Sequence, residues 1–300
     1  MSDEKKPFSL IHIDAGDLSK PINTLIKKIA NAIGIVFEPK HIKDVAEAEA
    51  VADRIRTTAQ IEKVERLQRA TFRFLAEQIK QQENIESIIT KAVPEVSEQA
   101  RPEQLEDDWI ANFFDKCRLI SDDEMQKLWA RILAGETNSP GKFSKRTVGL
   151  LASTDKSDAS MFNTICRFAC TIPPLTPIIY SYTQEIYSRQ GIDFAFLTHL
   201  ESIGVIRINV DSTFHFAVDD LEQNTLVDYF GSKIPLRFAG NDKMRKRNEL
   251  AIGQVMFTQA GEQLAGICGA KPLDGFFEFL KGSWASYAIP KPEVFGPPQF

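Results

Sequence analysis

The sequence has few of the residues that mark specialised classes of protein. Only 4 of its 300 residues are cysteines, and Cys117, Cys166, Cys170 and Cys268 are too scattered to form a disulfide framework. No run of apolar residues approaches the roughly 18 that a membrane-spanning helix requires. Residues 1–7 do not lead into an apolar secretion signal. We therefore expect a cytoplasmic protein without a membrane span.

An excess of positive charge is also absent. The chain carries 36 Lys and Arg against 41 Asp and Glu, which gives a net charge of −5 and a pI near 5.6. This balance excludes a protein whose whole surface is adapted to nucleic acid, but a local basic patch stays open. With 43% hydrophobic and 26% charged residues, the composition is that of a globular protein. The length predicts about two domains.

Signatures of catalysis are missing as well. The four histidines have no Cys, Asp or Glu partner at zinc-binding spacing, and they are His12, His41, His199 and His215. No Gly-x-Ser-x-Gly motif, typical of a serine nucleophile, occurs. His199 and His215 are expected to meet where a helix packs on a β-hairpin. We therefore predict a non-enzymatic protein without catalytic residues, cofactor or metal. A catalytic site assembled only in space is not excluded by this reasoning.

The most unusual feature is a long span without helix breakers. Between Pro39 and Pro94, 54 consecutive residues include neither Gly nor Pro, and most of them favour helix. An unbroken helix of about 50 residues would be about 75 Å long. A compact chain of this size has a diameter of only about 50 Å. The predicted helix is therefore longer than the body that would have to bury it.

Two arrangements resolve this mismatch. Either the helix breaks near Thr57–Thr58 or Gln81–Asn84 and folds back as a hairpin, or another copy of the chain or a partner covers it. The second is favoured because neither break contains Gly or Pro. Its assembly seam would consist of apolar residues at steps of three and four, namely Val45, Ala48, Ala52, Ile55 and Ala59. Beyond Glu62 the apolar residues change face, to Val64, Leu67, Phe74, Leu75 and Ile79.

A set of shorter helices is expected after this span. Asp107 or Asp108 can cap the first. Ser121 and Glu124 have the spacing of a capping box, which predicts a helix that ends at Gly135. Ser144 can cap the next, and a further helix is expected from about Asp155 to Cys170.

Four segments in this order resemble the bacterial family called domain of unknown function 2806. They are Ile35–Ala50, Gln82–Glu95, Glu124–Thr147 and Phe257–Ala270, and the third carries the string LWARILAGE followed by a Pro-Gly, Phe-Ser, Arg-Thr pattern. The resemblance implies a cytoplasmic bacterial protein that is long-helical at its front and winged-helix-like at its back. It supplies no catalytic residue. The family motif positions, which we interpret mainly as structural, are Trp129, Gly135, Pro140, Gly141, Ser144 and Arg146. An ion pair with the acidic region 103–124 is favoured for Arg146.

The last third of the chain has a mixed pattern. Ile192–Ile203 predicts a helix, and the alternating stretches 205–210 and 213–218 predict a hairpin, which together are typical of a winged helix. The helix contains no Lys or Arg, so a protein contact or a purely structural use is favoured over reading DNA bases. A strand at Ala251–Phe257, a helix from Gln259 to Ile267 capped by Thr258, and a helix opened by Asp274 follow.

The sequence thus predicts a mainly α protein with a long N-terminal helix, a helical middle module and a C-terminal α+β winged-helix-like module. The expected divisions are an N-terminal segment with a short helix, the assembly helix, the middle module, the winged-helix-like module and a Pro-rich tail, at 1–37, 38–94, 95–172, 173–289 and 290–300.

The expected function is that of a homo-oligomer that docks a protein partner. The alternative is a DNA-binding regulator whose phosphate contacts lie in the densest basic cluster, at Lys243, Arg245, Lys246 and Arg247.

Overall fold

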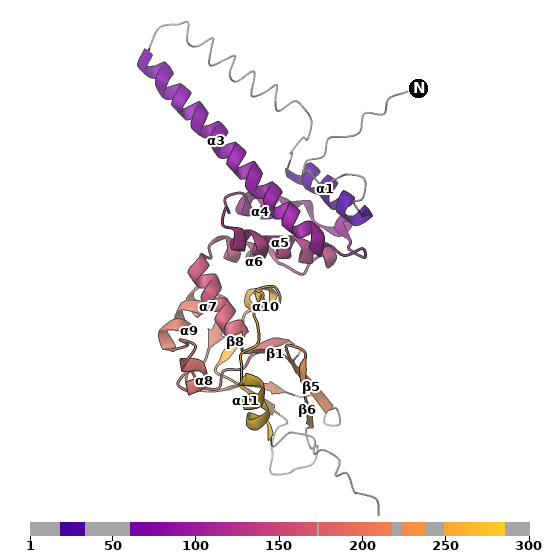
Figure 1. The fold of residues 1–300 in the computed structure, drawn as a ribbon, viewed down its shortest axis with the longest axis vertical. Coiled ribbons are helices and arrows are strands. Elements are labelled where there is room, and N and C mark those ends of the chain that lie inside the picture. Colours follow the sequence, from indigo (N-terminus) through magenta and orange to yellow (C-terminus); the bar gives the residue numbers. More distant parts are fainter. Residues whose placement is uncertain (1–18, 34–60, 173, 218–223, 238–248, 286–300) are drawn as a thin grey trace, which may run out of the picture. The chain divides into compact units, whose positions relative to one another are not determined.

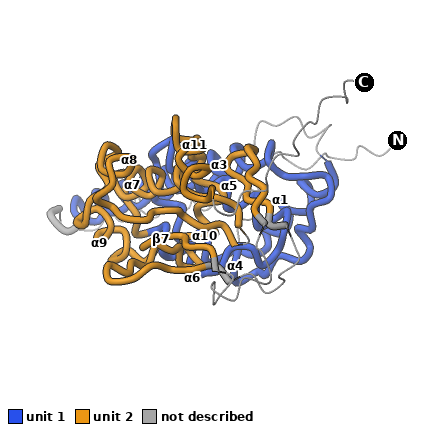
Figure 2. Tube along the Cα trace, turned by 90° about the horizontal axis from the view of Figure 1, so that it is seen from below, with its two compact units in different colours: residues 1–152 blue, residues 153–300 orange. Residues whose placement is uncertain are grey.

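A computed structural model describes residues 19–33, 61–172, 174–217, 224–237 and 249–285 of the chain. These residues are mostly helical, with short antiparallel strands confined to the second half (Figure 1). The chain divides into two compact units, residues 1–152 and 153–300, which Figure 2 distinguishes by colour. This division falls earlier than the boundary at 172/173 that the sequence suggested. The helix after residue 155 belongs to the second unit because it packs there against two other helices.

The first unit is helical throughout its described part. Its elements are α1 (Lys20–Ile33), α3 (Ile61–Ala92), the 3-10 turns η1 (Val93–Glu95) and η2 (Pro102–Gln104), α4 (Asp107–Cys117), α5 (Asp123–Asn138) and α6 (Lys145–Ala152). Trp109 and Phe113 stack at a ring-centroid distance of 5.1 Å, and Phe113 meets the fully buried Trp129 edge to face. This aromatic cluster joins α4 to α5 and forms the centre of the core.

Only one end of α3 packs on this core. Ile85, Ile88, Ile89 and Ala92 are buried, and the side-chain amide of Asn84 donates to the carbonyl of Arg118 at 2.9 Å. At 1.5 Å per residue the 32 residues of α3 are about 48 Å long. The N-terminal part extends past α4 and α5 in Figure 1. The helix is continuous through Gln81–Asn84, so the break considered there is wrong.

Helix α5 differs from its prediction at both ends. Its N-cap is Asp122 instead of Ser121, because the Asp122 carboxylate accepts the N–H groups of Glu124 and Met125, each at 3.1 Å. The helix also continues past Gly135 to Asn138. Gly135 is required for packing: a Cβ there would lie 2.7 Å from Cε2 of Phe143.

The second unit combines helices with strands. It contains α7 (Lys156–Cys166), β1 (Ala169–Thr171), β2 (Leu175–Pro177), α8 (Glu185–Ser188), α9 (Phe194–Ser202), β3 (Ile206–Ile208), β4 (Phe214–Ala217), β5 (Asn224–Tyr229), β6 (Ser232–Arg237), β7 (Glu249–Gly253), β8 (Val255–Phe257), α10 (Gln259–Ala265) and α11 (Phe276–Ser283). Asp155 and Thr258 cap α7 and α10. Helix α7 ends at Cys166, so Cys170 lies in a strand and not in the predicted helix. The N-cap residue of helix α11 is Gly275, so Asp274, which was expected to open this helix, does not cap it.

The strands form three antiparallel sheets. One has the order β2-β1-β5-β6, and the others are the pairs β3-β8 and β4-β7. The predicted hairpin between 205–210 and 213–218 is therefore wrong: Ile206 pairs with Phe257, and Ala217 pairs with Glu249. The β3-β8 pair and the β4-β7 pair are neighbours along the same two stretches of chain, because the Asn209 N–H after β3 donates to the carbonyl of Gln254, which lies between β7 and β8, at 2.9 Å. Both stretches thus pair with the region near residue 250. Strands β5 and β6 lie in the chain between β4 and its partner β7.

Several predictions concern residues outside the described ones. They include the assembly seam Val45, Ala48, Ala52, Ile55 and Ala59, the basic cluster Lys243, Arg245, Lys246 and Arg247, and the Pro-rich tail 290–300.

Candidate interaction surfaces

The family motif forms a tightly held loop between α5 and α6. Glu136 is buried, and its carboxylate accepts the N–H groups of Gly141 at 2.6 Å and Phe143 at 2.7 Å. The carbonyl of Phe143 accepts the indole N–H of Trp109 at 2.7 Å. Burial raises the pKa of the Glu136 carboxyl, and the two backbone donors oppose that rise. These contacts hold the loop between α5 and α6.

The remaining motif positions also have local structural contacts. Gly141 has a φ of +88°, a conformation that favours glycine, and the Ser144 hydroxyl accepts the N–H of Thr147 at 3.1 Å to cap α6. Half-buried Pro140 lies in the same turn. Arg146 is exposed and makes no ion pair within the described residues. Its neighbour Lys145 takes the expected contact with the acidic region, at 3.7 Å from Asp108.

The projecting part of α3 presents large apolar side chains. Leu67, Phe72, Phe74 and Ile79 are 49%, 66%, 58% and 61% exposed. Together with the half-buried Val64 and Leu75 they make up what we call the α3 apolar face. At 100° per residue these six positions span roughly 160° of the helix circumference. A two-stranded coiled coil uses a narrower seam, so this width fits a helix with more than one apolar neighbour.

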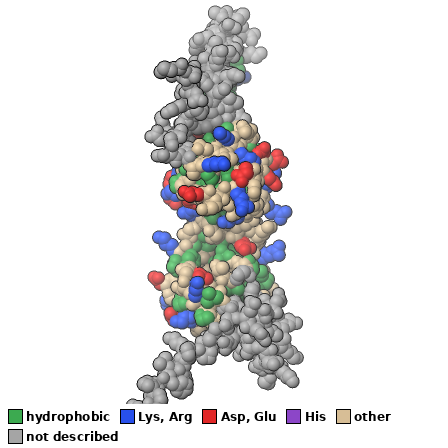
Figure 3. Space-filling model, turned by 90° about the vertical axis from the view of Figure 1, so that its right-hand side faces the viewer, with side chains coloured by type: hydrophobic (Ala, Val, Ile, Leu, Met, Phe, Trp, Pro, Cys, Tyr) green, Lys and Arg blue, Asp and Glu red, His purple; other side chains and the backbone are tan. Residues whose placement is uncertain are grey.

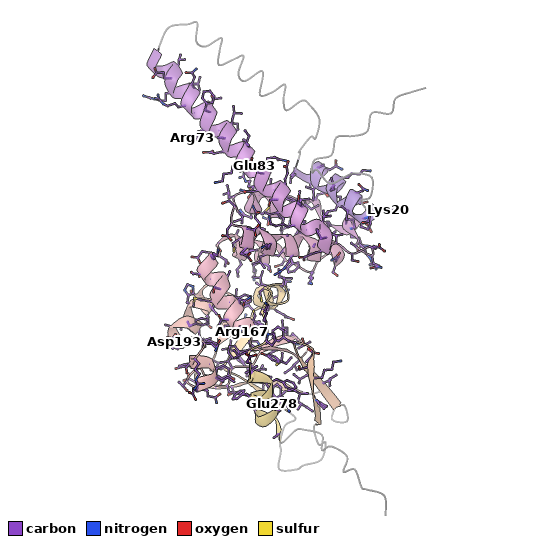
Figure 4. All side chains as sticks on the ribbon, in the orientation of Figure 1. Lys20, Arg73, Glu83, Arg167, Asp193 and Glu278 are labelled. Carbon is purple, nitrogen blue, oxygen red and sulfur yellow. The ribbon has the colours of Figure 1, made fainter. Side chains whose placement is uncertain are left out.

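The opposite side of α3 is polar and charged. Arg66, Arg69, Arg73 and Lys80 lie within roughly 60° of one another on that side, counted at 100° per residue. Arg69 pairs with Glu65, and Arg73 with Glu77, each at 3.6 Å. Figure 4 shows Arg73 on the projecting part of the helix and Glu83 nearer to the packed end. This charged side suits contact with water, so the α3 apolar face is the side available for docking.

Helix α9 carries an exposed aromatic residue at its start. Phe194 is 50% exposed, and its ring lies 6.1 Å from that of Tyr182. The helix sequence FAFLTHLES contains no Lys or Arg. Asp193 caps it by accepting the N–H of Phe196 at 2.7 Å, and Glu201 accepts the N–H of Ile208 at 2.9 Å. The helix therefore offers no Lys or Arg side chain to a phosphate.

The two described histidines do not meet. His199 Nε2 lies 2.6 Å from Oδ1 of Asp158 on α7, whereas His215 lies exposed on β4. The second oxygen of Asp158 accepts the N–H of Asp155 in a capping box. Asp158 thus joins α9 to the start of α7. The sequence did not single out Glu136, although this residue ends the LWARILAGE string, and it gave no signal for the contact of Asp158 with His199.

Within the described parts of the chain, no group of three or more His, Cys, Asp or Glu residues is arranged to hold a metal ion. No described helix combines the length and the hydropathy needed to cross a membrane. The face in Figure 3 shows Lys and Arg interspersed with Asp and Glu on the described surface, so neither sign dominates that view.

The comparisons with known proteins agree with the motif. A family described as "Protein of unknown function (DUF2806)" matches residues 68–281. The chain belongs to this family. The match includes the Glu136 loop and the packed end of α3. No curated protein and no solved structure matches the chain.

Proposed function

We propose that this member of DUF2806 is a non-enzymatic homo-oligomer that assembles through α3 and docks a protein partner through its second unit. The observation that carries the proposal is the α3 apolar face, with four large side chains about half or more exposed. Monomeric soluble proteins seldom leave such a contiguous patch uncovered. The occupant we propose is the same face of other copies of the chain, because the charged side of α3 carries the ion pairs Arg69–Glu65 and Arg73–Glu77 and suits water, whereas the apolar side chains leave water only by packing on another apolar surface.

The second unit supports a winged-helix-like interpretation. With β1 and β2 after α7 and the strands β4 to β7 treated as insertions, the elements α7, the strand bridge at Ile179, α8, α9, β3 and β8 follow the helix-strand-helix-helix-strand-strand order of that fold. Ile179 bridges to Gly253, and its carbonyl accepts the N–H of Gln254 at 2.7 Å. Gly253 has a φ of +111°, and a Cβ there would overlap the Ile179 carbonyl. In this interpretation the wing is formed by the pair of β3 and β8, and the pair of β4 and β7 extends it.

The position of α9 corresponds to the helix that reads DNA in many winged-helix proteins. Base and phosphate contacts need Arg, Lys, Asn or Gln on that helix, and α9 has none of them. Exposed Phe194 beside acidic residues suits a protein partner with apolar and basic side chains. The alternative, a DNA-binding regulator, depends on Lys243, Arg245, Lys246 and Arg247, which lie outside the described residues.

Light scattering of the purified full-length chain tests assembly. We expect a mass that is a multiple of the 33.8 kDa chain, and a fall to the single-chain mass in the Leu67→Ser/Phe74→Ser variant. Arg66→Ser/Arg73→Ser is the matched control on the opposite side of the same helix and should retain the assembly. A wild-type monomer at micromolar concentration, or equal loss in both variants, contradicts assembly through this face.

A DNA-binding titration separates the two docking hypotheses. A protein-docking unit should bind duplex DNA no more tightly in the wild type than after neutralisation of Lys243, Arg245, Lys246 and Arg247. If wild-type affinity is high at low salt, falls steeply with added salt and is lost in that variant, the regulator hypothesis replaces protein docking.

A further inference from the structure

One side of α3 is exposed along the projecting part and buried at the packed end. About five turns of an α-helix take 18 residues, so residues with that spacing lie in one line along the helix. Leu67 is therefore in line with Ile85, and Phe74 is in line with Ala92. Leu67 and Phe74 are exposed, whereas Ile85 and Ala92 are buried in the first unit, where α3 packs against α5 and α4. The space beside this line is open at one end of the helix and filled at the other.

This arrangement restricts how the α3 of a second copy can lie on the open side. The restriction rests on the assembly through α3 proposed above. In a closed parallel pair the symmetry axis runs along the helices, so the two helices are in register, and a staggered parallel pair continues into an open filament. Packed helices have axes about 8–10 Å apart. A parallel second helix in register would pass Ile85 and Ala92 at this distance, where the first unit already covers both side chains.

An antiparallel second copy avoids this conflict. The two-fold axis is then perpendicular to both helices, so the packed ends lie at opposite ends of the pair. From residue 64 onward, Asn84 is the first buried residue of α3. Residues 64–83 are thus the part that can overlap with the same part of a second copy. At 1.5 Å per residue this overlap is about 30 Å long.

The charges along α3 favour the same orientation. Residues 61–73 contain four basic and two acidic side chains, whereas residues 74–86 contain one basic and three acidic side chains. Antiparallel packing places the positive half of one helix beside the negative half of the other, and parallel packing places like charges together. Exposed ion pairs add little free energy, but like charges that face each other disfavour the parallel orientation of the same apolar surface.

We propose that α3 packs antiparallel on the α3 of a second copy, with residues 64–83 of the two chains overlapping. The centre of the overlap lies between Arg73 and Phe74, so the exposed Phe72 and Phe74 rings of both copies come together there and leave water. The apolar surface is complete only when both copies are present. If further copies join, each neighbouring α3 is again antiparallel, and a closed assembly of this kind contains an even number of chains.

Distances between spin labels in the full-length chain test the orientation. The parent is Cys268→Ser, because Cys268 is the one cysteine that is not buried. The unlabelled parent, treated with the label reagent, shows that the three buried cysteines do not react. One cysteine is then added on the charged side of α3 and labelled with a nitroxide, in the variants Arg66→Cys, Arg73→Cys and Lys80→Cys. Pulsed electron double resonance measures the distance between labels on neighbouring copies.

Antiparallel packing predicts a distance that depends on the position of the label. Along the helix axes, labels at position 73 should be only about 2 Å apart, whereas labels at positions 66 and 80 should be about 22 Å and about 20 Å apart. The three positions lie on one side of the helix and share the same lateral separation. Position 73 should therefore give the shortest distance, and the mass should be an even multiple of 33.8 kDa.

The possible failures are distinguishable. Light scattering of the unlabelled Cys268→Ser chain comes first, and a monomer contradicts both assembly through α3 and the antiparallel orientation. An oligomer with equal distances at positions 66, 73 and 80 contradicts only the orientation, because parallel helices keep each position level with itself. A distance that rises steadily from position 66 to position 80 does the same, since it indicates parallel helices that diverge. An odd number of chains also contradicts the orientation while leaving assembly intact.

Discussion

The carboxylate of Glu136 holds Phe143 from one side by accepting its backbone N–H at 2.7 Å, and Trp109 holds the same residue from the other side through its carbonyl. Helices α4 and α5 thereby fix the loop that starts α6 with two side-chain contacts to one residue. The ring of Phe143 is buried and packs on Gly135. The LWARILAGE string and the Pro-Gly, Phe-Ser pattern after it thus supply the residues that join α4, α5 and α6.

Replacing Glu136 tests the strength of this contact. Glu136→Ala leaves the N–H groups of Gly141 and Phe143 without an acceptor and is expected to lower the free energy of unfolding by about 2–4 kcal/mol. Glu136→Gln keeps one acceptor oxygen and should cost less. Urea denaturation followed by circular dichroism measures both. Glu124→Ala, an exposed position on the same helix, is the control and should change stability by less than about 1 kcal/mol.

Gly135 and Gly149 form a matched pair of helical glycines. Gly135→Ala places a Cβ 2.7 Å from the Phe143 ring, so the ring must shift, and we expect a loss of about 1–3 kcal/mol despite the better helix propensity of Ala. Gly149→Ala on α6 meets no atom within 4 Å and should instead stabilise by up to about 1 kcal/mol. Thermal unfolding distinguishes the two signs. Equal effects would mean that the Phe143 contact is unimportant.

The pair formed by Asp158 and His199 should be asymmetric. Asp158 is buried and supports both His199 and the capping box of α7, so Asp158→Ala is expected to cost roughly 1–3 kcal/mol. The His199 side chain is 45% exposed, so His199→Ala should cost less than about 1 kcal/mol. A double-mutant cycle measured by urea denaturation gives the coupling. Coupling near zero would show that the 2.6 Å contact adds nothing to stability.

Acid should remove the contribution of the Asp155 cap. The N–H of Asp158 is the main cause that lowers the pKa of the Asp155 carboxyl below its usual 3.8, and the Ser157 hydroxyl adds to it. A lowered pKa in the folded state gives stability that is present above pH 3.8 and is lost as the pH falls through the folded value. The difference in unfolding free energy between wild type and Asp155→Ala should therefore shrink below pH 3.8, in urea titrations at a series of pH values. A difference that grows with acid would contradict this assignment.

Local chemistry made several features predictable. Ser144 and Thr258 cap the helices that the sequence assigned to them, and α7 begins beside Asp155 as expected, because helix starts depend on residues only two or three positions apart. The same locality explains two errors. Ser121 and Asp122 are adjacent candidates for one cap, and the sequence does not rank them without the geometry of the turn. Gly135 resembles a helix end, but the helix continues through it, and its missing side chain leaves the space that the Phe143 ring occupies.

Contacts between residues far apart in the sequence could not be predicted from local patterns. Strand β3 alternates as a hairpin strand should, yet its partner is β8 and not the neighbouring β4. The contact of Asp158 with His199 likewise joins residues far apart in sequence. Each residue type alone is compatible with many partners.

The sequence by itself determined the family, the helical character of the first half and most helix starts, because these depend on composition, short spacing and neighbouring side chains. Only the tertiary structure decided which strand pairs with which, where Glu136 and His199 find their partners, and which apolar residues of α3 remain exposed. The physical reason is that burial and long-range pairing depend on how all elements pack together. A helix pattern states which side is apolar, but only the packed neighbours decide how much of that side is covered.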